Sequence, residues 1–369
     1  MEFIPISQPS VGPREREYLI KAFDSGWISS LGAYIDEFER EFARRTGTKF
    51  AIAVSNGTVA LHLALEGLGA GAGDEVIVPD LTFIATANTV VHAGATPILV
   101  DVDPRTGCIS PEAIEVAITP RTKVIMPVHL YGHPAEMARI VAIAKKHNLL
   151  VVEDAAEAQG ADIGGQIVGS FGDCATFSFY GNKLMTTGEG GMVTTNDEKL
   201  ATKMRRLRDH AMSPQKRYWH TEVGFNYRIT NLQAAVGVGQ LERIDELLSL
   251  KRGIFARYEK NLAGVASLKL NQTLAGYRSS YWMVCVSHER WEDSSRNTFM
   301  AELKKQNVDS RPFFYPLSDM GIFLPPRQPT PVTHRLSQSG LNIPSFVGMT
   351  DEQIDYVSDV IRGLAGKLA

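Results

Sequence analysis

Between residues 50 and 195, short runs of apolar and β-branched residues alternate with stretches of helical periodicity. The strand-like runs cover residues 50–54, 75–79, 96–102, 123–128 and 149–154, with helical stretches at 58–69, 83–94, 111–118 and 137–148 between them. Strands buried on both faces have continuous apolar sequences, and the helices between them form right-handed crossovers. The pattern therefore predicts an α/β fold built on a large, mostly parallel sheet.

The remainder of the chain indicates a second, smaller domain. Residues 231–262 contain no proline and space their apolar side chains by threes, fours and sevens, which predicts one long helix between two domains. A basic helix beginning near residue 196 is interpreted as having a solvated face, formed by Lys199, Lys203, Arg205, Arg206 and Arg208. Residues 265–369 mix short strands with helices, as in an α+β domain. We expect a large domain over residues 26–245 and a small domain over residues 246–369 together with residues 1–25.

Composition narrows the classes of partner. The 369 residues carry a net charge of −3, which does not provide the basic surface that nucleic acid or an anionic membrane attracts. Cys108, Cys174 and Cys285 lie far apart and form no C-x-x-C pair, which argues against a disulfide framework and a metal site. The N-terminus lacks a signal-peptide pattern, and no apolar run reaches about 18 residues. We expect a cytoplasmic protein with no nucleic-acid or membrane partner.

The segment SNGTVALHLAL places Asn56, Gly57 and Thr58 between a strand and a helix. Free backbone N–H groups and the positive end of the helix dipole favour an anion there, most simply a phosphate. Taken alone, the same residues also fit an ordinary helix N-cap.

Asp154, in LLVVEDAAEAQGA, follows a fully apolar strand at its carboxyl end. Open α/β sheets bind their ligands at that edge. Asp154 is therefore either a capping residue or a carboxylate that keeps the nitrogen of a bound heterocycle protonated. Glu157 lies one helical turn further on and either approaches a ring hydroxyl or caps a helix.

Lys183 lies in SFYGNKLMTTGEGGMVTT, just after the next strand. A single lysine on a glycine-flanked loop is more often a solvated charge. Here, however, it comes just after a strand, which should place its amine at the same edge of the sheet as Asp154 and the anion site. Pyridoxal 5′-phosphate requires this set, because its phosphate needs N–H donors, its ring nitrogen a carboxylate and its aldehyde an amine. Ser178 can add a hydroxyl to the phosphate. Phe83, after the strand 75–79, either stacks on the pyridine ring or belongs to the core.

Ten ordered segments give the chain a clear resemblance to a known family. They are GWISSLG (26–32), SNGTVALHLAL, GDEVIVPDLTFIATAN, GATPILVDVDP, VHLYGHPAEM, VVEDAAEAQGA, GDCATFSFYGNK, TTGEGGMVTT, VGFNYRITNLQAA and LNIPS. Over almost its whole length the chain resembles the DegT/StrS-type sugar nucleotide aminotransferases. The resemblance implies the aspartate aminotransferase-like fold (fold type I), pyridoxal phosphate, which cycles through pyridoxamine phosphate, and a homodimer with shared active sites.

The resemblance also implies roles for individual residues. Lys183 would form the Schiff base and Asp154 would face the pyridine nitrogen. Cofactor contacts would come from Gly57, Thr58, Phe83, Glu157 and Ser178, and from Asn226 of the neighbouring subunit. Substrate contacts are expected from Trp27, Ile28, Ser29, Arg228, Arg311 and Tyr315.

Within the family, SFYGNK with TTGEGG, RYWH and GFNYRITN is most similar to members that aminate the C4 ketone of GDP-4-keto-6-deoxy-mannose with glutamate. Members that act at C3 or C4 of UDP- or dTDP-linked sugars are the alternative. Two positions depart from the family pattern: Ser318 stands where many relatives have histidine, and Phe83 where tyrosine is common.

Other classes fit less well. An NAD-dependent oxidoreductase would need G-x-G-x-x-G after the first strand, where this chain has one glycine. A dehydratase of the same fold would have histidine in place of Lys183. A non-catalytic ligand-sensing regulator would carry a DNA-binding module and a basic face, and the sequence suggests neither.

Overall fold

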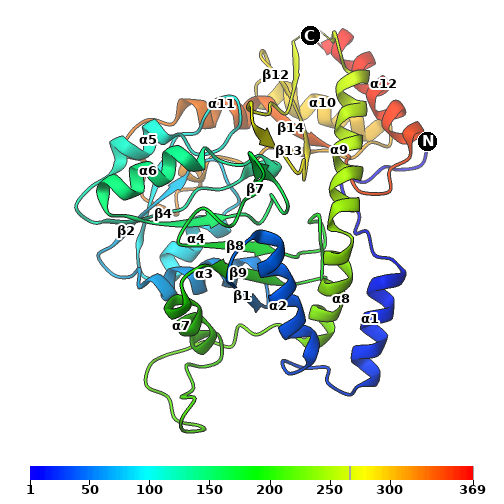
Figure 1. Ribbon diagram of the computed structural model, residues 1–369. Helices are drawn as coiled ribbons and strands as arrows, with labels where there is room; N and C mark the ends of the chain where they lie inside the picture. The colour runs from blue at the N-terminus through cyan, green and yellow to red at the C-terminus, as the bar shows by residue number, and fades with distance from the viewer. Residues whose placement is uncertain (266, 369) are drawn as a thin grey trace.

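A seven-stranded sheet forms the centre of the computed structural model (Figure 1), which describes residues 1–265 and 267–368. Its strand order is β1-β9-β8-β5-β4-β2-β3. The strands are β1 (Phe50–Val54), β2 (Glu75–Pro79), β3 (Thr96–Val100), β4 (Thr122–Ile125), β5 (Leu150–Asp154), β8 (Cys174–Ser178) and β9 (Gly191–Thr195). Only β9 runs against its neighbours, so the prediction of a large, mostly parallel sheet is confirmed.

Crossover helices connect the parallel strands, as the sequence predicts. They are α3 (Gly57–Leu68), α4 (Ala85–His92), α5 (Pro111–Ala117) and α6 (Met137–His147). Figure 1 shows α5 and α6 together on one side of the sheet, and α3 and α4 on another. A short 3₁₀ turn, η1 (Leu130–Gly132), follows β4.

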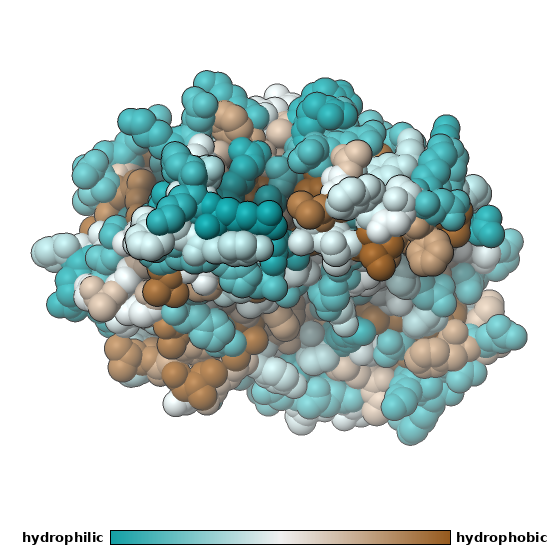
Figure 2. All heavy atoms as spheres, turned by 90° about the horizontal axis from the view of Figure 1, so that it is seen from below, coloured by the Kyte–Doolittle hydropathy of each residue, from teal (hydrophilic) through white to brown (hydrophobic). Residues whose placement is uncertain are grey.

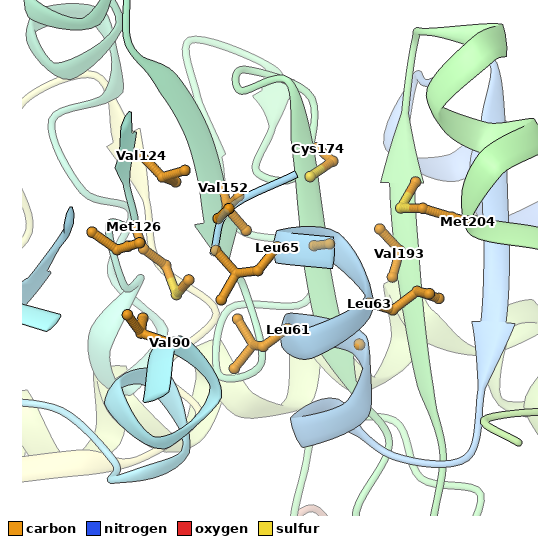
Figure 3. Close-up of a cluster of buried hydrophobic side chains, with 14 of the residues drawn as sticks. Leu61, Leu63, Leu65, Val90, Val124, Met126, Val152, Cys174, Val193 and Met204 are labelled. Carbon is orange, nitrogen blue, oxygen red and sulfur yellow. The ribbon is translucent and has the colours of Figure 1, made fainter. Parts of the chain in front are cut away.

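Helix α3 contributes many side chains to the hydrophobic core that packs against the large sheet. Figure 3 shows Leu61, Leu63 and Leu65 of this helix directed toward side chains of neighbouring strands, among them Val152 and Val193. Of these five side chains Leu61 is the most exposed, at 3%. Because α3 is apolar on nearly every side, it is buried as an internal helix rather than an amphipathic surface one.

A second sheet forms the smaller part of the molecule, in the order β10-β12-β14-β13. Its strands are β10 (Leu268–Leu270), β12 (Val284–His288), β13 (Arg311–Pro312) and β14 (Gly340–Ile343). The neighbouring helical elements are α10 (Asp293–Lys305), η2 (Leu317–Met320), α11 (Pro331–Ser339) and α12 (Asp351–Leu368). A separate three-stranded sheet joins β11 (Tyr277–Arg278) to β6 (Asp162–Ile163) and β7 (Gln166–Ile167).

The prediction of one continuous helix over residues 231–262 is wrong in one respect. The structure has two helices end to end, α8 (Asn231–Glu242) and α9 (Ile244–Asn261), separated at Arg243. Arg243 has φ −101° and ψ 3°, outside helical geometry. Its guanidinium group contacts Glu15 and Glu246, which stabilises the break. Figure 1 shows the two helices as one column along one side of the molecule, with α9 beside the smaller sheet and α8 beside α1 and α2.

The N-terminal residues contact both parts of the molecule. Ile4 forms a parallel bridge with Val308 beside the smaller sheet. Helix α1 (Pro13–Asp24) packs instead along α8, and α2 (Ala33–Thr46) packs against α8 and β1.

The interpretation of the basic helix as having a solvated face is also wrong in part. In α7 (Glu198–Arg208), Arg208 and Arg205 form ion pairs with the buried Glu39 of α2, and Lys203 donates to the carbonyl oxygens of Glu66 and Gly67 at the end of α3. The basic side chains therefore join α7 to its neighbours. None of the helices in the described ranges combines the length and apolarity that crossing a membrane requires.

Candidate active site

Lys183 lies in the turn that follows β8, where its backbone N–H donates to the carbonyl oxygen of Tyr180. Its side chain is 12% exposed, and its Nζ atom is 3.8 Å from Oε1 of Glu157. On another side, Nζ is 3.8 Å from the centre of the Trp282 ring. The amine is therefore held in a largely dry space between a carboxylate and an indole face.

Asp154 ends β5, which pairs in parallel register with β8, so that Asp154 lies beside Thr176. Its side chain is buried and accepts hydrogen bonds from the Thr86 hydroxyl at 2.9 Å and the Ala156 N–H at 3.2 Å. Burial raises the pKa of Asp154, while the Thr86 hydrogen bond and the Lys183 charge lower it. A buried carboxylate needs a cationic partner to remain charged at low cost, and a protonated ring nitrogen is such a partner.

Glu157 accepts a hydrogen bond from the backbone N–H of Tyr131 at 2.9 Å. Tyr131 is a buried residue with φ 51°, a left-handed conformation that is unusual for a non-glycine residue. No helix begins directly after Asp154, because residues 155–161 form turns and irregular structure. The helix-capping alternative for Glu157 is therefore wrong.

Asp154, Glu157 and Lys183 influence one another's pKa. Burial raises the pKa of Glu157 to about 7, although Lys183 and the Tyr131 N–H act in the opposite direction. Burial lowers the pKa of the Lys183 amine, while Glu157 and Asp154 raise it. An amine with a lowered pKa is more often neutral near pH 7, which a nucleophile or proton acceptor requires.

The predicted anion site lies next to the strand that leads to Lys183. Asn56 caps α3 through its side chain, which accepts from the Val59 N–H at 2.9 Å. The N–H groups of Gly57 and Thr58 come first in the helix and have no partner inside it. A Cβ atom on Gly57 would lie 2.7 Å from Cβ of Ser178, so glycine is needed for the close approach of α3 to β8.

Phe83 lies in the turn between β2 and α4 and is 55% exposed. The centre of its ring is 5.8 Å from that of Phe314. Exposure of this size contradicts the core alternative for Phe83.

Several other predicted residues form a second group around the start of α8. The backbone carbonyls of Trp27 and Ser29 accept hydrogen bonds from the side chain and the backbone N–H of Asn231, respectively. Trp27 and Ile28 are exposed. Arg228 pairs with Asp209 at 2.8 Å and donates to Oδ1 of the exposed Asn226.

Arg311 and Tyr315 lie in the segment that runs from β13 toward η2. Tyr315 is 49% exposed. Ser318 donates both its N–H and its hydroxyl to the buried Asp80, each at 2.8 Å. Ser318 therefore fastens this segment to the end of β2.

Comparison with known proteins assigns the chain to a family. The model of the DegT/DnrJ/EryC1/StrS aminotransferase family matches residues 9–362. The chain belongs to this family. It is thus a pyridoxal phosphate-dependent aminotransferase of fold type I, and the predicted fold, enzyme class and cofactor are confirmed.

Individual relatives match over nearly their full length. The chain is 48% identical to a GDP-perosamine synthase of Caulobacter vibrioides, with 96% of each chain covered. It is 45% identical to a GDP-perosamine synthase of Escherichia coli O157:H7, with 98% of each covered. Among solved structures, the PMP-form of Spr1654 from Streptococcus pneumoniae superposes with a TM-score of 0.94 at 28% identity, covering 99% of this chain and 98% of that one.

The residues of this aminotransferase fit its cofactor. The α3 N-terminus beside Ser178 offers donors for a phosphate, Asp154 offers a buried carboxylate, and Lys183 offers a largely buried amine. Oδ1 of Asn182, adjacent to Lys183, is buried and has no hydrogen-bond partner among the residues described.

Some contacts in the aminotransferase site were not predicted from the sequence. Thr86 donates to Asp154, Tyr131 donates to Glu157, and Trp282 covers the amine of Lys183. Thr86 lies in the family-matching segment GDEVIVPDLTFIATAN, close to Phe83, so the sequence contained a signal that it belongs to the site. Trp282 comes from the smaller part of the chain, and no spacing in the sequence relates it to Lys183.

We predict that Glu157→Gln flattens the pH dependence of folding stability between about pH 5 and 7. A pKa raised from 4.5 to about 7 makes the folded protein bind a proton more tightly than the unfolded chain in that interval. The free energy of unfolding therefore falls as the pH rises through it, and glutamine removes this contribution.

Urea unfolding of cofactor-free protein at several pH values measures the effect. Glu259→Gln, at an exposed position of α9, is the control and should keep the wild-type slope. Identical slopes for wild type and Glu157→Gln would contradict the raised pKa.

Proposed function

We propose that this aminotransferase transfers the amino group of L-glutamate to the C4 ketone of GDP-4-keto-6-deoxy-D-mannose, yielding GDP-perosamine and 2-oxoglutarate. The observation that carries the proposal is the 48% and 45% identity, over 96% and 98% of this chain, to two proteins named GDP-perosamine synthase. We also propose that the product is used in polysaccharide biosynthesis, such as that of an O-antigen.

Lys183 is proposed to be both the covalent attachment point and the proton carrier. Pyridoxal phosphate, when bound, supplies an aldehyde that exchanges amines and a ring that accepts electron density. The Nζ atom of Lys183, once free, would move the proton from Cα of the donor glutamate to the cofactor in the first half of the reaction, and a proton from the cofactor to C4 of the sugar in the second half. Burial, which lowers the pKa of this amine, favours the neutral form that the step needs.

The other residues are proposed to hold the cofactor in register with Lys183. Gly57, Thr58 and Ser178 would bind the phosphate through N–H and hydroxyl groups. The Asp154 carboxylate, oriented by Thr86, would keep the ring nitrogen protonated. Phe83 would cover one face of the ring. Glu157, fixed by the Tyr131 N–H, would lie near the ring hydroxyl.

We also propose a homodimer in which Asn226 of one subunit reaches the phosphate site of the other. Exposed apolar residues near Asn226 support a second copy as the covering surface. They are Phe23 near the end of α1, Trp27, Ile28 and Leu31 between α1 and α2, and Tyr218, Trp219 and Val223 in the loop after α7. The face in Figure 2 carries apolar patches among polar side chains, and such patches commonly mark protein interfaces.

The compartment is proposed to be the cytoplasm. Cys108, Cys174 and Cys285 are all free and buried. Structural disulfides are rare in reducing compartments. Three unpaired thiols are therefore consistent with a reducing compartment such as the cytoplasm.

We predict that the enzyme prefers GDP-4-keto-6-deoxy-D-mannose over UDP- and dTDP-linked keto sugars. The assay incubates it with glutamate and each sugar, and follows both the release of 2-oxoglutarate and the position of the new amine. Turnover of UDP- or dTDP-linked sugars alone, or amination at C3, would overturn the GDP-perosamine proposal and leave the family assignment intact.

We predict that Lys183→Ala abolishes covalent cofactor attachment and lowers turnover by about 10³-fold or more, since both nucleophile and base are lost. Borohydride reduction followed by mass spectrometry should add the mass of one reduced cofactor to wild type and none to the variant. Lys145→Ala, on an exposed face of α6, is the control. A covalent adduct in Lys183→Ala would show that another lysine holds the cofactor.

We predict that inactive Asn226→Asp and Lys183→Ala subunits restore activity when mixed. In a shared-site dimer, a mixed pair has one site with both defects and one site with neither. Verified mixed dimers should therefore show about half of the wild-type activity, because one of two sites is intact. Mixed dimers that stay inactive would indicate sites built from single subunits.

A further inference from the structure

Trp282 makes two contacts with consecutive residues of the Lys183 turn. The Lys183 Nζ atom lies 3.8 Å from the centre of its ring. Its indole Nε1–H donates to the carbonyl oxygen of Asn182 at 2.8 Å. Trp282 precedes β12 and belongs to the smaller part of the molecule, whereas Lys183 follows β8 of the large sheet. The catalytic turn is therefore held from outside its own sheet.

Trp282 is itself fixed by further contacts. The Nζ atom of the buried Lys251, in α9, donates to the carbonyl oxygen of Trp282 at 2.9 Å. The Tyr131 ring lies nearly parallel to the indole, with ring centres 6.3 Å apart. The backbone of Gly132, at φ 102°, also comes close to that of Trp282. Glycine is needed there, because a Cβ atom would lie 2.7 Å from the Trp282 backbone nitrogen. The indole therefore has little freedom to move.

The two contacts restrict different parts of Lys183. An indole face attracts an ammonium group, more strongly where water is excluded. The hydrogen bond to Asn182 holds the backbone from which the side chain extends, and its geometry is that of an ordinary N–H···O bond. Together they limit both where the side chain starts and where it ends.

We propose that Trp282 is a positioning residue that sets the location of the Lys183 amine, and thereby the rate at which that amine captures the cofactor aldehyde. The inference rests on the proposed role of Lys183 as the attachment point. Positioning of a nucleophile contributes to rate because a misplaced amine must first reorganise before it reacts.

Trp291 is a matched comparison within the same part of the chain. Trp291 is 3% exposed and Trp282 7% exposed, so both are core residues by burial alone. Trp291 stacks on His288 and lies against Phe299, and both partners belong to the smaller part of the molecule. A tryptophan that served only for packing should behave like Trp291.

The test measures how fast cofactor-free, full-length protein captures pyridoxal phosphate, by stopped-flow absorbance across a range of pH. Trp282→Phe keeps an aromatic ring but loses the N–H donor and the stronger attraction of the indole face for a cation. Trp282→Leu loses the aromatic ring as well as the N–H donor. Above the midpoint of the pH–rate profile, where the amine is neutral in every variant, capture should slow by on the order of 3- to 10-fold in Trp282→Phe and further in Trp282→Leu. Trp291→Phe should capture at the wild-type rate.

The pH profile supplies a readout that packing alone would not move. Glu157 and Asp154 act on the amine, and Lys251 contacts the backbone carbonyl of Trp282; all three stay unchanged in the variants. Weakening the attraction between ring and ammonium lowers the pKa of Lys183, so the midpoint of the rate profile should move down by on the order of half a pH unit in Trp282→Phe.

Unfolding midpoints in urea accompany each variant as a measure of stability. A wild-type capture rate and pH midpoint in Trp282→Phe would overturn the inference, as would an equal slowing in Trp291→Phe. If Trp282→Leu does not fold, Trp282→Phe still decides between the outcomes. Failure of the proposed role of Lys183 is separable, because it would appear as a covalent adduct in Lys183→Ala.

Discussion

The active-site architecture depends on removing one amine and two carboxylates from water at the same edge of a sheet. Parallel strands bring their carboxyl ends together, which places Asp154 and the turn of Lys183 side by side. Each buried charge then needs a specific partner, because an unpaired one would be costly. Thr86 contacts Asp154, Tyr131 contacts Glu157, and Trp282 contacts Lys183. The two sheets must meet at this point for all three partners to be present.

Most of the large sheet could be predicted from the sequence, because strands buried on both faces leave continuous apolar runs. The break between α8 and α9 could not, since apolar spacing continues through it. Arg243 leaves helical geometry while its side chain contacts Glu15 and Glu246. Glu15 lies in α1, far away in the sequence. Likewise, Arg205 and Arg208 resemble a solvated face until Glu39 of α2 is seen beside them.

The residues of the candidate site also divide into those that could be predicted from the sequence and those that could not. Lys183, Asp154, Gly57 and Ser178 all lie at or shortly after the carboxyl ends of strands of one sheet, so their proximity could be predicted from topology. Trp282 reaches the site through contacts between the two parts of the molecule, which spacing along the chain does not encode. Asn226 and the expected substrate residues remain predictions, because their roles depend on a second subunit and on bound substrate.

The burial of all the native thiols has a practical consequence for studying subunit geometry. Burial raises the pKa of Cys108 to about 12 and raises those of Cys174 and Cys285 as well. A maleimide reagent, which attacks exposed thiolates, should therefore leave the folded wild-type chain largely unmodified near neutral pH. A cysteine substituted for the exposed Lys145 of α6 would then accept a spin label or dye at one defined place per chain, without first removing any native sulfur.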